Sequence, residues 1–236
     1  MAAWGGYPQT VNYSTVNVAK GGGSENLLIN PRGKINQVGE LNGVVAAGQY
    51  FCDGWKAGAA GAEIYVDTDG FRLISGSIVQ LVPNTIEAGR NLRSNMDVIS
   101  GTPVMSINGG TNNEPNGVGE YIQLEISGDN SKFSRVILAE SVELPIYQQS
   151  ADEEKPCKNF LQKINLGRER GYSPDSSGVY TSKSIQRMHK KPAGSLFGMI
   201  DPSIYVSDTT EDGVTLAYIT SGAFDATISV ILDARP

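Results

Sequence analysis

The amino-acid sequence predicts an all-β protein made of packed antiparallel sheets. Short apolar runs separated by turn residues recur along most of the 236 residues, a pattern typical of antiparallel strands. Glycine is abundant at 28 residues, whereas charged residues make up only 19%. That composition suits a sandwich with many turns better than a helical bundle. Only the stretch 150–164 has the apolar spacing of a helix.

The segment 26–82 shows the strand pattern most regularly, because glycines divide it into short apolar runs. Asp67-Thr-Asp-Gly70 is expected to be a hairpin turn, since Asp and Gly tolerate the positive φ of a tight turn. It could also mimic part of a calcium loop, but the downstream ligands of an EF-hand are missing. The expected strands are Val44–Ala47, Tyr50–Cys52, Ala62–Val66, Phe71–Ile74 and Ile78–Val82.

Further strands and one long polar loop are expected up to residue 147. The loop is Asn108–Gly117, which is rich in asparagine and glycine. With the earlier runs, the total is eight or nine strands, enough for two packed sheets. The added strands are Asn95–Ser100, Pro103–Ile107, Gly119–Ile126 and Phe133–Leu138.

Leu144–Tyr147 marks an expected boundary, after which a short helix should join a second β-domain. Ser150 or Asp152 can cap the helix, and Pro156 is allowed only near its start, so the regular helix is expected to begin there. Its apolar stripe would be Cys157, Phe160, Leu161 and Ile164. The strands expected beyond it are Gly178–Ile185, Ser203–Ser207, Gly213–Thr220 and Ala226–Asp233.

Several linked segments resemble bacteriophage virion-fibre proteins, in which such a sequence opens a jelly roll similar to carbohydrate-binding modules. Segments in the right order are more specific than any single motif. The chain departs from the family at Val38 and Gly54, where arginines would be expected. The matching segments are Asn26–Asn30, Ile35–Gln37, Ala47–Tyr50, Asp53–Gly61, Gly76–Val82, the Phe133 strand, Cys157 with Phe160, Lys191-Pro192 and Leu232–Arg235.

The resemblance implies a jelly-roll β-sandwich and a smaller C-terminal β-domain, joined by one short helix. The expected organisation is an extended N-terminal attachment arm over 1–23, the jelly roll over 24–147, and the helix with the small domain over 148–236. Related fibre modules are typically trimers, so a homotrimer is expected. Strand-forming residues of the arm are expected to attach the protein to other virion proteins, although a disordered terminus is an equal alternative. They are Tyr7, Val11, Tyr13, Val16 and Val18.

Composition argues against several classes of protein. The net charge is −6, whereas a nucleic-acid surface requires clustered Lys and Arg. The one basic cluster, Arg187–Lys191, is short. No run approaches a membrane span, and the start lacks a secretory signal. Together with the missing signal, the resemblance to virion-fibre proteins implies synthesis in the host cytoplasm, release by lysis, and a place on the virion surface.

No catalytic constellation, cofactor motif or metal site is evident, so the protein is not expected to be an enzyme. The single histidine, His189, has no obvious partner, and acidic groups such as Asp208/Glu211/Asp212 are sequence neighbours rather than carboxyls held across a cleft. The two cysteines are expected to be buried thiols rather than a bridge.

The binding hypothesis rests on amide and aromatic side chains, because sugars stack on aromatic rings and hydrogen-bond to amides. Trp55 and Tyr121 are more readily explained as core residues. The expected function is recognition of host surface polysaccharide by a tail-fibre type of adhesin. A head-decoration or head-fibre protein is the alternative, and a depolymerase the second alternative. The candidate glycan-binding residues are Asn108, Asn112, Asn113, Asn116 and Tyr65.

Overall fold

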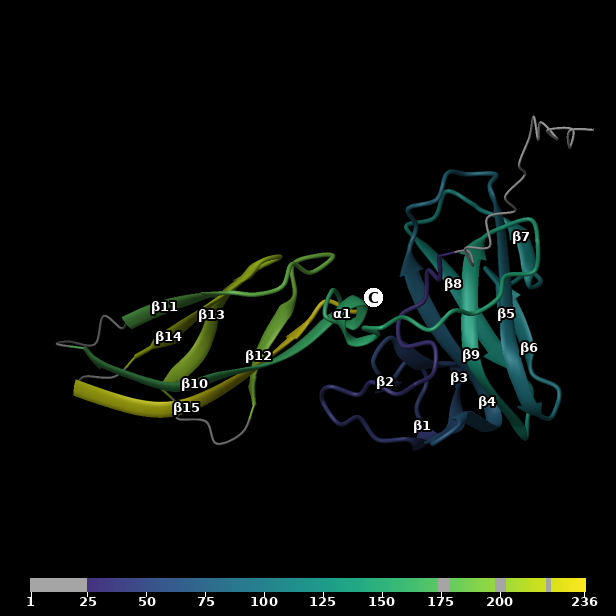
Figure 1. Cartoon of the computed structure of the whole chain (residues 1–236). Coiled ribbons are helices and arrows are strands. Elements are labelled where there is room, and N and C mark those ends of the chain that lie inside the picture. The colour runs from purple at the N-terminus through teal and green to yellow at the C-terminus, as the bar shows by residue number, and fades with distance from the viewer. Residues whose placement is uncertain (1–24, 174–178, 198–202, 220–221) are drawn as a thin grey trace, which may run out of the picture.

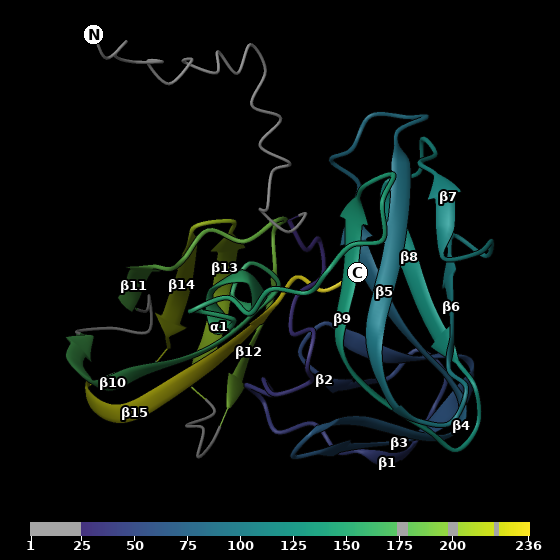
Figure 2. The ribbon, with the colours of Figure 1, turned by 45° about the vertical axis from the view of Figure 1, so that its right-hand side comes forward.

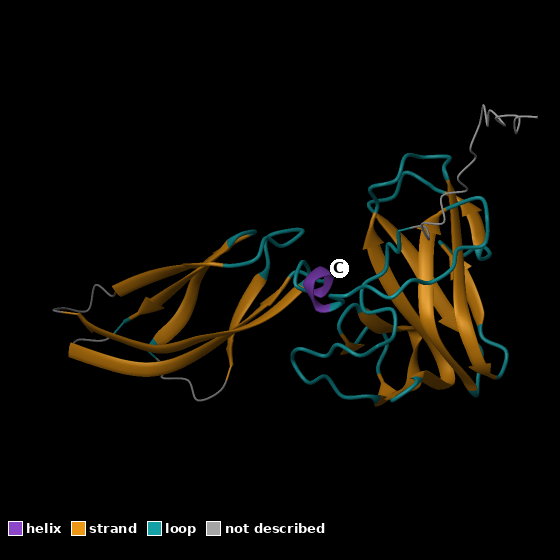
Figure 3. Cartoon of the chain, viewed as in Figure 1, coloured by secondary structure: helices purple, strands orange, loops and turns teal. Residues whose placement is uncertain are grey.

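The computed structural model describes residues 25–173, 179–197, 203–219 and 222–236. The candidate attachment residues of the arm lie outside these ranges. The described chain forms two β-sandwiches, one after the other, with a single turn of helix, α1 (Glu154–Cys157), where they meet (Figure 1). Nearly every regular element is a strand (Figure 3), which confirms the predicted all-β class.

The first sandwich is a nine-stranded antiparallel system folded into two layers. From β5 to β9 the chain alternates between the layers, as in a jelly roll: β5, β7 and β9 pair in one, and β6 and β8 in the other. Its strands are β1 (Gly43–Val45), β2 (Tyr50–Cys52), β3 (Trp55–Asp67), β4 (Gly70–Pro83), β5 (Asn91–Ser100), β6 (Val104–Ile107), β7 (Asn113–Pro115), β8 (Tyr121–Ser127) and β9 (Ser131–Glu140).

The long β3–β4 hairpin belongs to both layers. The first part of β4 pairs with β9 through Phe71–Leu73, and the second part pairs with β8 through Ser77–Pro83. The hairpin bends where its register shifts between Ala57 and Ala62. Gly76 allows the bend, because its φ is +82° and a Cβ there would lie 2.3 Å from the Gly61 carbonyl oxygen. Bends of this kind let one strand turn the corner of a sandwich.

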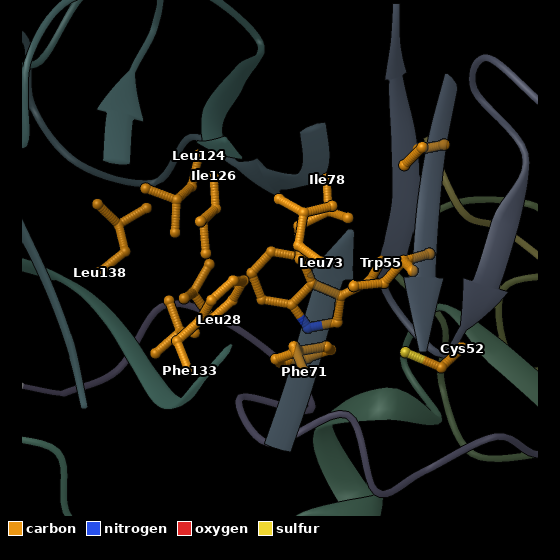
Figure 4. Packing of buried hydrophobic residues seen from close by; sticks show 14 of the residues in the cluster. Leu28, Cys52, Trp55, Phe71, Leu73, Ile78, Leu124, Ile126, Phe133 and Leu138 are labelled. Carbon is orange, nitrogen blue, oxygen red and sulfur yellow. The ribbon is translucent and has the colours of Figure 1, made fainter. Parts of the chain in front are cut away.

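The core between the layers is built around Trp55, which is fully buried. Its indole lies 5.3 Å from the ring of Phe71, measured between centroids, and Phe71 lies 5.6 Å from Phe133 (Figure 4). The indole Nε1–H donates to the Asn30 carbonyl oxygen at 2.9 Å. Aromatic area and a satisfied polar edge together make this residue a stabilising centre of the core.

The second sandwich consists of two three-stranded sheets, ordered β10-β15-β12 and β11-β14-β13. Strands β10 and β15 run together as a long curved ribbon (Figure 2). Leu216, Tyr218, Val230 and Leu232 are fully buried between the sheets. The strands are β10 (Leu161–Ser173), β11 (Val179–Ser184), β12 (Ala193–Phe197), β13 (Ile204–Thr210), β14 (Gly213–Tyr218) and β15 (Gly222–Asp233).

The helical prediction for 150–164 was wrong in extent. The helix ends at Cys157 instead of beginning at Pro156, and Leu161 already belongs to β10. The Asp152 carboxylate accepts from the Lys155 amide at 3.0 Å, as a residue near a helix start can. The stripe failed because Leu161 pairs with Asp233 and Ile164 with Val230, so tertiary pairing overrides the local helical spacing.

Other differences concern strand ends. The runs 71–74 and 78–82 are one strand, β4, and the glycine-rich segment before Ala62 is part of β3. The expected polar loop contains the short β7, and β10 and β12 were not predicted. The Asp67–Gly70 hairpin turn is confirmed, because these two residues pair across it.

Candidate functional site at the junction of the sandwiches

The residues that carry the fibre-protein resemblance form a buried polar network. The Asn30 amide nitrogen donates to the carbonyl oxygens of Ile35 (2.8 Å) and Asp53 (3.0 Å). The Asp53 carboxylate accepts from the backbone N–H of Gln37 at 2.9 Å and from its side chain at 2.6 Å. Burial raises the pKa of Asp53, and the Gln37 hydrogen bonds partly offset that rise. These residues therefore hold local structure.

The same network reaches the second sandwich. The Gln37 side-chain nitrogen also donates to the Leu161 carbonyl oxygen at 2.7 Å, at the start of β10. One side chain thereby joins the loop before β1 to the first strand beyond α1. The polar network of Asn30, Gln37 and Asp53 therefore also contacts the second sandwich.

Gly54, one of the two departures from the fibre pattern, sits in the tight turn between β2 and β3. Its φ is +80°, and a Cβ would lie 2.6 Å from Ile29 Cγ1. An arginine could not be placed on this backbone without moving Ile29. Glycine at this position therefore allows the turn to pack closely against Ile29 in the N-terminal segment.

The last residues of the chain form a second contact between the two sandwiches. The Arg235 guanidinium lies 2.5 Å from the Glu40 carboxylate and 2.7 Å from that of Asp233, and its Cζ is 4.0 Å from the Tyr50 ring centroid. The Pro236 carbonyl oxygen accepts from the Tyr50 hydroxyl at 2.6 Å. Burial raises the pKa of Glu40 more than the Arg235 charge lowers it, so the ion pair does not fully offset desolvation.

A groove of about 680 Å³ lies between the two sandwiches, next to α1. This volume falls within the usual range for ligand sites, roughly 300–1,000 Å³. Both sandwiches, α1 and the N-terminal segment contribute side chains to it. They are Glu25, Asn26, Leu27, Leu28, Ile29, Val82, Pro83, Thr85, Lys155, Pro156, Asn159, Phe160, Gln186, Arg187, Met188 and His189.

The aromatic part of the groove is a pair of half-buried rings. The Phe160 and His189 rings are 4.6 Å apart between centroids, inclined at 38°. The His189 Nε2 lies 3.5 Å from the Tyr121 hydroxyl oxygen. Burial lowers the pKa of His189, and the charge of Lys190 lowers it further. His189 is therefore neutral at pH 7, when it can stack and accept a hydrogen bond.

A second hollow of about 240 Å³ shares Glu25, Asn26, Leu28, Ile29 and Pro156 with the groove. Along it, the Tyr147 hydroxyl donates to one Glu153 oxygen at 2.5 Å, and Arg32 pairs with the other at 3.0 Å. Burial raises the pKa of the Tyr147 hydroxyl, as do its hydrogen bond and proximity to Glu153. These contacts connect the segment just before α1, which contains Tyr147 and Glu153, to Arg32 of the first sandwich.

The predicted glycan-binding asparagines lie elsewhere and have unequal environments. Asn108, Asn112 and Asn113 are exposed in and beside β7, although Asn108 Oδ1 accepts from the Gln123 amide at 2.8 Å and Asn113 Oδ1 from the Asn91 side chain at 2.8 Å. Asn116 is only 4% exposed, and its amide donates to Asn84 and the Ile86 carbonyl. Asn116 thus supports the loop from inside.

Tyr65 is not brought together with those asparagines. It pairs with Arg72 near the β3–β4 turn, whereas the asparagine loop lies beside the other end of β4. The Arg72 guanidinium covers the Tyr65 ring at 4.3 Å from its centroid. The fully buried Trp55 belongs to the core, as expected, whereas Tyr121 is half-buried beside the groove.

The expected buried thiols are confirmed: Cys52 and Cys157 are both free and buried. Burial raises the pKa of each, so neither is an activated nucleophile. Of the acidic neighbours, Glu211 pairs with Arg187 at 2.8 Å and Asp208 with Lys191 at 2.9 Å. Within the described ranges, no three His, Cys, Asp or Glu side chains are grouped to hold a metal ion.

Comparison with family models, with the curated proteins and with the solved structures finds no match. In the part of the chain that the structure describes, no helix has the length and apolar character needed to cross a membrane.

Sequence reasoning missed the groove. The sequence signals at the groove were His189 and the basic cluster Arg187–Lys191, and neither had a predicted partner.

Proposed function

We propose that this chain is a non-enzymatic bacteriophage virion-surface protein of the adhesin type, which recognises a host surface glycan. The observation that carries the proposal is the groove at the junction. It combines half-buried rings with the exposed amide of Asn159 and exposed cations, the side-chain types that bind sugars. Among the acidic side chains described above, Glu40, Glu153, Asp208 and Glu211 are engaged in ion pairs with arginine or lysine. Binding without turnover is the function that this set of groups supports.

A second candidate is a structural role as a head-decoration or head-fibre protein. Exposed apolar side chains favour it, because they are typical of protein–protein contacts. Val44, on the edge strand β1, is 88% exposed, and Leu41 just before it is 81% exposed. A homotrimer could bury these residues, as could a contact with another virion protein.

Purified full-length chain should bind intact host bacteria and compete with the phage for adsorption. Binding that disappears after periodate oxidation of the cell surface would identify a glycan receptor. No release of reducing sugar is expected over prolonged incubation, and such release would instead favour a depolymerase. Absence of cell binding, with immunogold label on the capsid, would favour the decoration role.

The oligomer can be tested on the same material. Light scattering should give three times the mass of one chain, both for the full chain and after deletion of residues 1–20. The deletion should also prevent incorporation into particles. A monomeric truncated protein would show that the arm holds the subunits together, and its continued incorporation would place attachment elsewhere.

A further inference from the structure

The seam between the sandwiches is locally basic, although the whole chain has a net charge of −6. Lys155 and Arg187 line the groove, and Lys155 forms no ion pair with any described residue. Lys190 is close enough to His189 and to Lys56 to lower the pKa of both, in addition to the larger effect of burial. Neither Lys190 nor Lys56 lines the groove, so Lys155 and Arg187 are the cations that a ligand there would meet.

Negative charge at the groove is sparse by comparison. Glu25 lies at the N-terminal side, and Glu211 is already paired with Arg187. Glu120 and Glu211 raise the pKa of His189 less than burial and Lys190 lower it. Two cations, Lys155 and Arg187, and one carboxylate, Glu25, line the groove, so its lining favours ligands that carry carboxylate or phosphate.

The flat part of the lining limits the ligand further. Phe160 and His189 offer neighbouring half-buried rings, and Asn159 and Thr85 are exposed polar side chains on the walls. A ring with an apolar C–H face and hydroxyls at its rim matches that arrangement, because its face can stack while its edge hydrogen-bonds. A bare inorganic anion would leave the rings unused.

We propose that this groove binds a short acidic oligosaccharide, with Phe160 and His189 stacking against a sugar ring and Lys155 pairing with its carboxylate. This rests on the proposed glycan-binding function and names both its ligand class and its site. It moves the site from the asparagine loop 108–116 to the junction. The ligand would contact both sandwiches at once.

The test uses the full chain on an array of purified bacterial capsular polysaccharides and lipopolysaccharide O-chains. The strongest binder is then compared in its native and carboxyl-reduced forms. We expect a preference for the native acidic form, which weakens as salt rises because the charges become screened. Equal binding of the carboxyl-reduced form would overturn the assignment of an acidic ligand.

The site itself is tested with exposed residues, whose substitution leaves the core intact. Lys155→Glu should weaken binding about tenfold or more, and Thr85→Trp should do so by filling the groove. The matched control is Asn112→Ala/Asn113→Ala, which should bind within about twofold of wild type. Thermal melting of each variant checks that it is folded.

The outcomes separate the two proposals. Binding that survives both groove substitutions but is lost in the asparagine variant would overturn the groove assignment and leave glycan recognition standing. Wild-type protein that binds neither the array nor host cells would overturn the proposed function, and the groove assignment with it.

Discussion

Replacing Arg235 with methionine should allow the two sandwiches to unfold independently of each other. Methionine keeps much of the side-chain volume but leaves the Glu40 carboxylate without its cation. The side chains of Arg235 and Glu40 are only 9% and 14% exposed, so little water is available to replace the lost partner. Breaking a buried ion pair by removing one member costs about 3–5 kcal/mol. Because Glu40 keeps slight exposure, we expect about 3 kcal/mol.

The assay is urea unfolding followed at two places. Trp55 fluorescence reports the core of the first sandwich once Trp4 has been replaced by phenylalanine, since the chain has two tryptophans. Far-ultraviolet circular dichroism reports both sandwiches. The parent protein should show coincident transitions by the two probes, whereas the Arg235→Met protein should show an earlier loss of circular dichroism before the Trp55 signal changes.

Arg135→Met is the matched control. Arg135 also pairs with a carboxylate, that of Asp97 at 2.9 Å, but the two side chains are 58% and 54% exposed. An exposed pair contributes about 0–1 kcal/mol. Adding Glu40→Gln to Arg235→Met should recover much of the loss, because it removes the uncompensated charge. Coincident, unshifted transitions in Arg235→Met would refute the idea that this clamp couples the sandwiches.

Three further predictions concern single residues. Because burial lowers the pKa of His189, the unfolded chain binds more protons there. Stability should therefore fall as pH drops from about 6.5, the ordinary histidine pKa, through the lower folded pKa. His189→Gln should flatten this part of a stability-against-pH curve, and an unchanged slope would contradict the argument. Gly54→Arg should lower the free energy of unfolding in urea by at least about 2 kcal/mol, because the backbone has a positive φ and the new side chain clashes with Ile29. Gly89→Ala, at φ +82° in open space, should lower it by only about 1 kcal/mol. Equal losses would show that packing against Ile29 does not matter. Cys157→Ala should lower the free energy of unfolding by about 1 kcal/mol or more, without changing the oligomer measured by light scattering. A mass increase of two hydrogens when the wild-type protein is reduced would show a disulfide instead of free thiols.

Local patterns allowed much of the first sandwich to be predicted. Tyr50–Cys52 was predicted with its exact bounds, and the turn at Asp67–Gly70 follows from side chains that tolerate the backbone it needs. The predicted helical stripe through Leu161 is wrong because Leu161 and Ile164 belong to a strand, β10, which pairs with β15, and apolar residues three apart occur in strands as well as in helices. Local spacing cannot show whether tertiary packing will select the helix or the strand.

The groove could not be predicted for a different reason. Asn26 and His189 line it together although they are far apart in sequence, and neither lies in a motif that points to the other. The asparagine loop looked more favourable because its polar residues are contiguous. Asn116 shows the weakness of that argument, because its amide is consumed by the backbone that it supports.

The closure of the first sandwich also constrains how the protein can be made. The Leu27 N–H donates to the Leu138 carbonyl oxygen at 2.8 Å, and the Leu138 N–H reaches the Asn26 side chain across 112 residues. A chain that leaves the ribosome from its N-terminus cannot complete this sandwich until β9 has emerged. The clamp between Glu40 and Arg235 spans 195 residues, so it forms only after Arg235 has left the ribosome. Until β9 has emerged, the nascent first sandwich exposes apolar strands and open edges, so chaperone binding over that interval should raise the yield of folded protein.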